Sequence, residues 1–107
     1  MFTKGLLGLL LLLFSVLEDQ PVLKGTVTDA DDSIYMQGAI VTIKNDDGYR
    51  IHPPVLTDAV QSFKIEELPE GKYHVTADFA GFKPKEKSIQ LKRGKEKEVN
   101  FELNKKE

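Results

Sequence analysis

Apolar and polar side chains alternate along the chain from residue 22 onward, a period of two that is typical of half-buried antiparallel β-strands. In "VLKGTVTD", Leu23, Gly25 and Val27 lie on one face, and "GAIVTIKN" repeats the pattern. Two strands are therefore expected at residues 22–29 and 38–45. Alternation or enrichment in β-forming residues predicts further strands at residues 49–56, 62–68, 72–80, 87–91 and 98–103.

Turn-forming residues separate these segments. "NDDG" at 45–48, "PEG" at 69–71 and "KRGK" at 92–95 supply the glycine or aspartate that a chain reversal needs. Pro53 and Pro54 each remove a backbone donor, so residues 49–56 are expected at a sheet edge, as one strand or two short ones. Seven short strands without an amphipathic helix predict an all-β fold, a seven-stranded antiparallel Greek-key β-sandwich. Its core is predicted to include Phe63, Tyr73, Val75 and Phe101.

The first 17 residues differ from the rest of the chain. A single charge, Lys4, precedes a Leu-rich run that extends to Leu17 with Ser15 as its only polar interruption. This run is short for a bilayer span, which needs about 20 residues. It predicts a short hydrophobic N-terminal signal peptide, with the mature chain beginning between Leu17 and Val22, or a retained anchor helix. The "KG" before the Leu run leaves pilin-type processing after Gly5 as a third alternative.

The length of 107 residues accommodates one domain. We divide the chain into a signal peptide or anchor at 1–17, a linker at 18–21, the β-sandwich at 22–104 and a charged tail at 105–107. Cysteine is absent, which suits a bacterial or archaeal envelope protein better than a small disulfide-bonded eukaryotic module.

The charge distribution excludes one class of partner. With 15 basic and 17 acidic residues, the chain has no global basic field for nucleic-acid binding. Acidic residues predominate between 18 and 70, and basic residues predominate between 83 and 107. Solvent-facing strand positions and loops account for this asymmetry.

Two longer segments carry the pattern of a known family: "GTVTDADDSIYMQGAIVTIKN" and "TDAVQSFKIEELPEGKYHVTADFAGFKPKEKSIQL". They resemble the carboxypeptidase regulatory-like domain, a transthyretin-like or prealbumin-like β-sandwich, in a G-x-V-x-D strand, a G-A-x-V strand, an L-P-x-G-x-Y motif and a G-F loop. The resemblance covers residues 23–103 and implies the fold rather than a role. Val60 and Gln61 stand where the family usually has Asp-Gly, so that turn must be built differently. The "DADDSIYMQGA" connection is also longer than usual.

Adhesin relatives of this family include domains that close a Lys to Asn isopeptide bond with help from a buried acid. Val27 and Ala77 occupy the matching lysine and acid positions in this sequence. Asn100 on the last expected strand therefore lacks both partners, and no isopeptide bond is expected.

No combination of residues indicates an enzyme. His52 and His74 are the only imidazoles, too few for a zinc site, and His74 is expected on a solvent-facing strand position. No serine lies in a G-x-S-x-G motif, and no phosphate-binding loop is present. Glu66 and Glu67 are adjacent and would point to opposite faces of a strand. We expect no catalytic residue, no cofactor and no metal site.

The acidic loop "DADDS" is the strongest remaining candidate for ligand binding. Asp29, Asp31 and Asp32 supply oxygen atoms that Ca²⁺ could use, although the glycine and the distal glutamate of an EF-hand loop are missing. Aspartate also favours turns for local hydrogen-bonding reasons, so an ordinary Asp-rich turn is the default interpretation.

Strand order predicts a single contact surface. If consecutive strands alternate in direction, the first, third and fifth connections emerge at one end of the sandwich, and the tight turns emerge at the other. These three connections are "DADDSIYMQ", the region around Asp58 and "AGFKP". Function usually resides on the longer loops that a scaffold presents. The candidate binding residues at this acidic, aromatic end are Asp29, Asp31, Asp32, Tyr35, Asp58 and Phe82.

These features favour an exported, non-catalytic binding or structural module that contacts a protein or carbohydrate of the cell envelope. The alternative is a subunit of a surface assembly, such as a filament, pilus or secretion component, held by its N-terminal hydrophobic segment or by edge-strand pairing. A periplasmic, secreted or cell-surface location is expected. Contact with a membrane would occur only through an uncleaved N-terminal segment.

Overall fold

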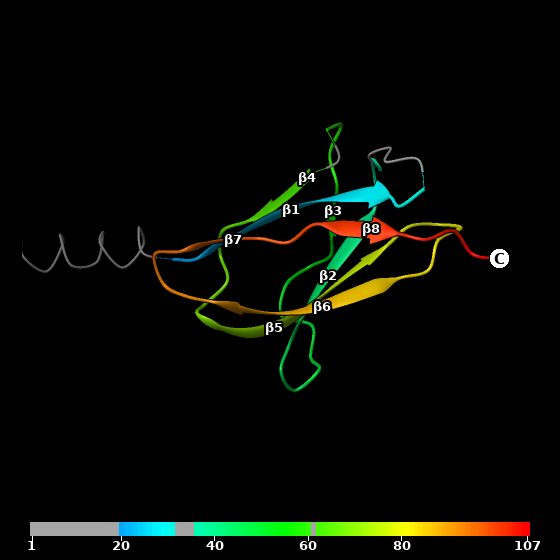
Figure 1. The fold of residues 1–107 in the computed structure, drawn as a ribbon. Helices are drawn as coiled ribbons and strands as arrows, with labels where there is room; N and C mark the ends of the chain where they lie inside the picture. The colour runs from blue at the N-terminus through cyan, green and yellow to red at the C-terminus, as the bar shows by residue number, and fades with distance from the viewer. Residues whose placement is uncertain (1–19, 32–35, 61) are drawn as a thin grey trace, which may run out of the picture.

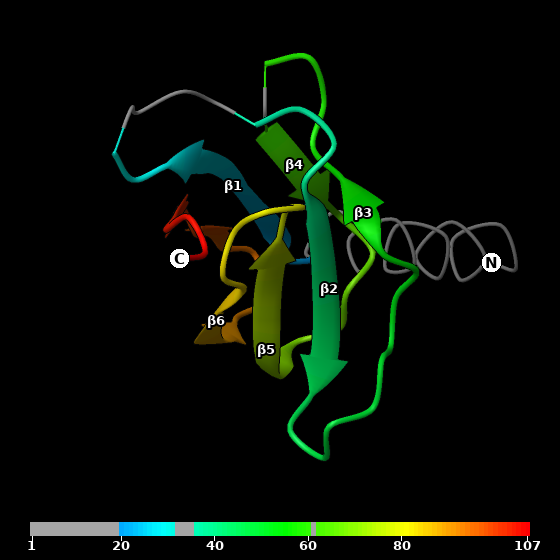
Figure 2. The ribbon, with the colours of Figure 1, turned by 90° about the vertical axis from the view of Figure 1, so that its right-hand side faces the viewer.

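The computed structural model describes residues 20–31, 36–60 and 62–107. These residues form a β-sandwich of two sheets with eight strands (Figure 1). Figure 2 shows β2 and β5 side by side in one layer, with β1 and β4 in the layer behind. The strands are β1 (Val22–Asp29), β2 (Ile40–Asn45), β3 (Val55–Leu56), β4 (Ser62–Ile65), β5 (Gly71–Asp78), β6 (Lys85–Leu91), β7 (Glu96–Glu98) and β8 (Phe101–Leu103).

The prediction of seven strands, all antiparallel, is wrong in two respects. The sheet with the order β3-β2-β5-β6 is antiparallel, but the other sheet is mixed, because β1 pairs with β4 antiparallel and with β7 and β8 parallel. Short turns dictate antiparallel pairing only between strands that they connect. β1 and the last strands are neighbours in the sheet but lie at opposite ends of the domain's sequence, so no turn constrains their relative direction.

The additional strand arises because pairing at the C-terminal end starts at Glu96, two residues before the expected strand at 98–103, and is interrupted after Glu98. β7 pairs Lys24 with Glu98, and β8 pairs Val27 with Phe101, so the register is unchanged across the interruption. Between them, the side-chain oxygen of Asn100 accepts hydrogen bonds from the backbone N–H and the hydroxyl of Thr26, at 3.1 and 3.0 Å. A side chain thus replaces the backbone in the ladder at this point.

The core lies between the two sheets and is formed by the predicted alternating positions. Phe63 and Phe101 come from the mixed sheet, and Tyr73 and Val75 from the antiparallel sheet; all four are buried, as predicted. Burial of such side chains stabilises the fold by about 1.5–3 kcal/mol each. Phe79 and Phe82 are partly buried and pack against this core.

The prolines correctly predicted which segment lies at a sheet edge. β3 is only two residues long, begins directly after Pro53 and Pro54, and lies at the edge of its sheet, as expected. No helix long and apolar enough to span a membrane occurs in the described part of the chain. The predicted signal or anchor helix at 1–17 lies outside the described residues.

Candidate functional site

The three connections that were predicted to form one end of the sandwich are linked by hydrogen bonds. The N–H of Gly38 donates to Thr57 O at 3.0 Å, which joins the first connection to the third. The C-terminal segment bridges the first and fifth connections, because Ala30 N–H donates to Leu103 O and Lys83 N–H donates to Asn104 O. The predicted grouping of these connections agrees with these contacts, whereas a binding role for this end stays a prediction.

Of the acidic residues that the structure describes at this end, Asp29 is the most buried, with 6% exposure. Its Oδ1 accepts a hydrogen bond from the backbone N–H of Asp31 at 2.9 Å, and its Oδ2 lies 3.7 Å from Lys105 Nζ. This carboxylate therefore holds the turn after β1 and ties the C-terminal segment to it. Asp31 itself is exposed.

Asp58 builds the turn that the family usually forms with Asp-Gly. Its Oδ1 accepts hydrogen bonds from the backbone N–H groups of Val60 and Ser62, both at 3.0 Å, and from the Ser62 hydroxyl at 3.2 Å. The bond from the Ser62 backbone, supported by those from the Ser62 hydroxyl and the Val60 backbone, holds the pKa of this carboxyl below its ordinary value. The side chain of Asp58 is thus engaged in local structure.

The remaining candidates contribute less to an open surface. Phe82 is half-buried and contacts Phe79 edge to face, with ring centroids 5.8 Å apart. Asp32 and Tyr35 lie outside the described residues. Among the residues that are described, no group of three or more histidine, cysteine or acidic side chains is arranged to hold a metal ion.

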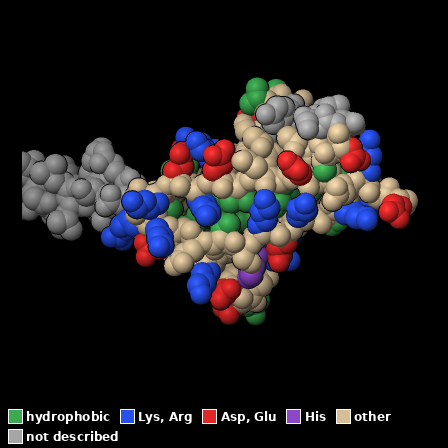
Figure 3. Space-filling model, in the orientation of Figure 1, with side chains coloured by type: hydrophobic (Ala, Val, Ile, Leu, Met, Phe, Trp, Pro, Cys, Tyr) green, Lys and Arg blue, Asp and Glu red, His purple; other side chains and the backbone are tan. Residues whose placement is uncertain are grey.

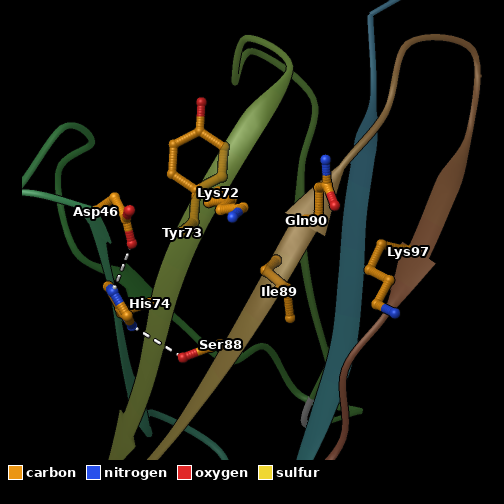
Figure 4. Close-up of a pocket in the computed structure, with 8 residues that line it drawn as sticks. All are labelled: Asp46, Lys72, Tyr73, His74, Ser88, Ile89, Gln90 and Lys97. Atoms are coloured by element: carbon orange, nitrogen blue, oxygen red, sulfur yellow. Dashed lines mark hydrogen bonds and ion pairs between the residues drawn. The ribbon is translucent and has the colours of Figure 1, made fainter.

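A second candidate surface is a shallow hollow of about 380 Å³ on the side of the sandwich, over β5 and β6 (Figure 4). Four of its polar side chains come from positions that face each other across the β5–β6 ladder, where Lys72 pairs with Gln90 and His74 pairs with Ser88. The residues that line the hollow are Asp46, Lys72, Tyr73, His74, Ser88, Ile89, Gln90 and Lys97.

His74 lies at the centre of the polar part of this hollow. Its Nδ1 is 3.0 Å from the Ser88 hydroxyl oxygen, and its Nε2 is 3.3 Å from Asp46 Oδ1 (Figure 4). A second carboxylate oxygen, on Glu86, lies 3.9 Å from Nδ1. The imidazole is thus held between a hydroxyl and two carboxylates, on the outer face of the sheet.

The row of Ser88, His74 and Asp46 has the residue types of a hydrolytic triad, but its setting differs. Ser88 lies within the regular strand β6, so its backbone N–H is directed in the plane of the sheet. In hydrolases with a G-x-S-x-G motif, the nucleophilic serine instead stands on a sharp turn, beside backbone donors that stabilise an oxyanion. This geometry is suited to binding polar groups through donors and acceptors.

Tyr73 separates this hollow from a larger one of about 630 Å³ near residues 51–53 and 67–69. Its hydroxyl donates to Pro69 O at 2.6 Å, and burial raises the pKa of its phenol. Half of the residues that line the larger hollow are apolar, namely Ile51, Pro53, Leu68 and Pro69, and its histidine, His52, contacts the neighbouring Pro53 carbonyl at 2.7 Å. Fewer polar groups converge there than over β5 and β6.

The sequence placed His74 on the solvent side of its strand but did not reveal its partners. Finding them requires the register between β5 and β6, which pairs His74 with Ser88. It also requires the position of the "NDDG" turn, which brings Asp46 to the same face. An outward histidine at the middle of a hairpin was the available signal, and alone it does not identify a site.

The sequence matches the family model of the carboxypeptidase regulatory-like domain over residues 22–104. The chain belongs to this family. No curated protein sequence matches the chain.

Solved structures agree with the fold of the family. The minor pilin of Streptococcus agalactiae superposes with a TM-score of 0.70 at 16% identity, covering 83% of this chain and 46% of the pilin. The 5-hydroxyisourate hydrolase of Klebsiella pneumoniae gives a TM-score of 0.65 at 16% identity, covering 79% and 85%. A carbohydrate-binding protein of Bacteroides uniformis, described as putative, gives 0.62 at 12% identity, covering 79% and 41%. The chain thus spans less than half of the pilin and of the Bacteroides protein, and these likenesses establish the prealbumin-like sandwich.

Proposed function

We propose that this chain is an exported, non-catalytic binding module that contacts a glycan or protein of the cell envelope through the hollow over β5 and β6. The observation that carries the proposal is the convergence of Lys72, His74, Ser88 and Gln90 on one concave face. An ammonium group, an imidazole, a hydroxyl and an amide together complement the hydroxyl, carboxylate and amide groups of glycans and peptides.

The hollow is a better contact surface than the acidic loop end. The carboxylates of Asp29 and Asp58 accept hydrogen bonds from their own turns, which leaves less of each group for a ligand. The side chains of Lys72, His74, Ser88 and Gln90 are exposed or half-buried and belong to the regular strands β5 and β6, which provide a rigid scaffold. The likeness in fold to the Bacteroides uniformis protein that is described as a putative carbohydrate-binding protein supports the same class of function.

Chemical-shift mapping tests this function. The ¹⁵N-labelled full-length chain is titrated with soluble peptidoglycan fragments and, separately, with Ca²⁺. We expect the fragments to shift residues of β5 and β6, and the double variant His74→Ala, Ser88→Ala to lose these shifts. Thr42→Ala, on the outer face of the neighbouring strand β2, is the control. Shifts confined to the loop end, or a response to Ca²⁺ alone, would overturn the assignment of the surface.

Export is the second part of the proposal and rests on the apolar segment at 1–17. The intact mass of the protein from its native host is expected to correspond to a chain that begins between Leu17 and Val22. A full-length chain recovered from the cytosol would contradict export.

A subunit of a surface assembly is the second candidate function. The observation that favours it is the likeness to the minor pilin of Streptococcus agalactiae, together with the edge strand β6. Filaments or large oligomers in the envelope fraction, seen by electron microscopy, would favour this alternative over a monomeric binding module.

A further inference from the structure

One side of the sandwich is open, because both sheets end there in strands with an unpaired edge. Within the described part of the chain, β6 pairs only with β5, and β7 and β8 pair only with β1. β6 and the β7–β8 segment thus face each other along this side (Figure 1). We call this side the seam; its inner-facing residues are Lys85, Lys87, Ile89 and Leu91 of β6, Lys97 of β7 and Phe101 of β8.

Lysines from both edges point into the seam. Along β6, Lys85 and Lys87 alternate in phase with the buried Ile89 and Leu91, so they occupy the inner face of their sheet. In β7, Lys97 lies opposite the fully buried Leu23 in the parallel ladder, which assigns it to the inner face of the other sheet. Inner positions usually hold apolar residues, and here they hold charges.

The seam combines these charges with apolar surface. Figure 3 shows a row of basic side chains along this face, with apolar side chains visible between and beneath them. Lys87 crosses the seam: its Nζ lies 5.4 Å from the centre of the Phe101 ring and donates a hydrogen bond to Asn100 O. Among the described residues, no carboxylate forms an ion pair with Lys85, Lys87 or Lys97.

We propose that the seam takes up an extended acidic segment of a partner protein, which pairs with the free edge of β6 as an added strand. The proposal rests on the binding function proposed above and names its partner, since Ile89 and Lys97 line both the hollow and the seam. Backbone groups at an unpaired edge bind an extended chain, and side chains at alternate positions select its sequence. The three lysines without carboxylate partners select acidic residues by charge complementarity.

The same lysines exclude unsuitable strands. Inward-pointing charges at a sheet edge disfavour pairing with an apolar strand, because pairing would bury the charge without a partner. A strand that carries carboxylates at the matching positions forms ion pairs with the lysines, so their charges are no longer buried without partners. The same lysines therefore disfavour apolar segments and attract acidic ones, and both effects contribute to the specificity of the seam.

The register along β6 specifies the partner pattern. In the antiparallel orientation, inner-facing residues of the added strand lie opposite Leu91, Ile89, Lys87 and Lys85 in turn. The complementary inner positions are therefore apolar, apolar, acidic and acidic, with polar residues between them. The synthetic peptide Val-Thr-Val-Thr-Glu-Thr-Glu has this pattern, and its lysine analogue Val-Thr-Val-Thr-Lys-Thr-Lys reverses the charges.

The experiment titrates the ¹⁵N-labelled full-length chain with these two peptides and with peptidoglycan fragments. We expect the glutamate peptide to bind, to shift the resonances of β6 and β7, and to slow hydrogen exchange at alternate β6 amides. The lysine peptide should bind at least roughly tenfold more weakly, as two cross-strand charge pairs would produce.

Charge-reversal variants distinguish recognition from loss of structure. The double variant Lys85→Glu, Lys87→Glu should exchange its preference and bind the lysine peptide, which an unfolded protein would not do. Lys85→Glu alone tests the register without disturbing the contact of Lys87 with Phe101. Lys44→Glu, an exposed residue of β2 away from the seam, is the matched control and should leave binding unchanged.

The outcomes separate this proposal from the one on which it rests. If peptidoglycan fragments shift β5 and β6 while neither peptide binds, the acidic-strand proposal fails and the binding function stands. If the glutamate peptide binds without slowing exchange in β6, or equally well to the charge-reversed variant, strand addition is refuted. Concentration-dependent protection of β6 without any peptide would indicate a second copy of the chain as the occupant and overturn the proposal.

Discussion

The carbonyl oxygen of Val99 lies so close to Gly25 that a β-carbon built on this glycine would stand only 1.7 Å from it. The N–H of Val99 donates to the carbonyl of Lys24, the residue before Gly25, at 2.8 Å. The same β-carbon would also meet the ring of Phe63 at 2.8 Å. Glycine at position 25 thus lets the segment between β7 and β8 come into direct contact with the backbone of β1.

Gly25→Ala is therefore expected to lower the free energy of unfolding by about 3 kcal/mol, the upper range for overpacking, because a backbone carbonyl must move. Thermal or urea denaturation measures the change. Gly48→Ala is the control: it has a φ of 87° and open space around it, so it should cost only about 1–2 kcal/mol of backbone strain. Equal losses in the two variants would contradict the close approach at Val99.

The faces of the strands could be predicted from sequence, whereas the pairing of the chain ends could not. Alternation directly reports which residues of a strand lie inward, and the buried positions of β2, β5 and β8 agree with it. The parallel contact of β1 with β7 and β8 depends on residues 74 positions apart, for example Thr26 and Asn100. No local pattern encodes such a contact. Gly25 at an inward position indicates the close approach of another backbone, but the sequence does not say that the approaching segment is the one at Val99.

Phe63→Ala tests the predicted core. Phe63 is 4% exposed and lies on the inner face of β4, where its removal leaves a cavity between the sheets. The expected loss is about 3–5 kcal/mol, a large fraction of the stability of a domain of this size. Ile65→Val in the same strand is the matched control, with an expected loss of about 1 kcal/mol. A melting temperature that hardly changes in Phe63→Ala would contradict the assignment of the inner face.

For the candidate site, the sequence predicted where residues lie but not what they contact. Asp29, Asp58 and Phe82 could be assigned to one end because the order of strands determines where connections emerge. The contacts of these residues were not predictable, since whether an aspartate faces a ligand or its own turn depends on backbone angles within the loop. The hollow over β5 and β6 was missed because it depends on the pairing of His74 with Ser88 across a ladder.

Asp58→Ala is expected to lower the melting temperature at neutral pH, because three donors lose their acceptor. The folded-state pKa of Asp58 is lower than its ordinary value of 3.8, so its contribution to stability is present above pH 3.8 and is lost as the pH falls through the folded-state pKa. The difference in melting temperature between the parent chain and the variant should therefore shrink in acid.

Asp47→Ala is the control for this prediction. Its carboxylate accepts no hydrogen bond in the described portion of the chain, although its backbone N–H donates to Asn45. This variant should melt close to the parent at neutral pH. A difference between the parent and Asp58→Ala that stays constant from neutral to strongly acidic pH would show that the charge of Asp58 is not involved.

Tyr73 gives the corresponding prediction at high pH. Burial raises the pKa of its phenol above the ordinary value of 10.0. The folded state therefore holds this proton more tightly than the unfolded state does. The contribution of Tyr73 to stability is fully present below pH 10.0 and is lost as the pH rises through the folded-state pKa.

Titration followed by tyrosinate absorbance should show a late step that is missing in Tyr73→Phe. Because this variant also loses the hydrogen bond to Pro69 O, it should be less stable by about 1 kcal/mol at neutral pH. If the signal lost in Tyr73→Phe instead lies at the start of the titration, the phenol is not buried as the structure describes.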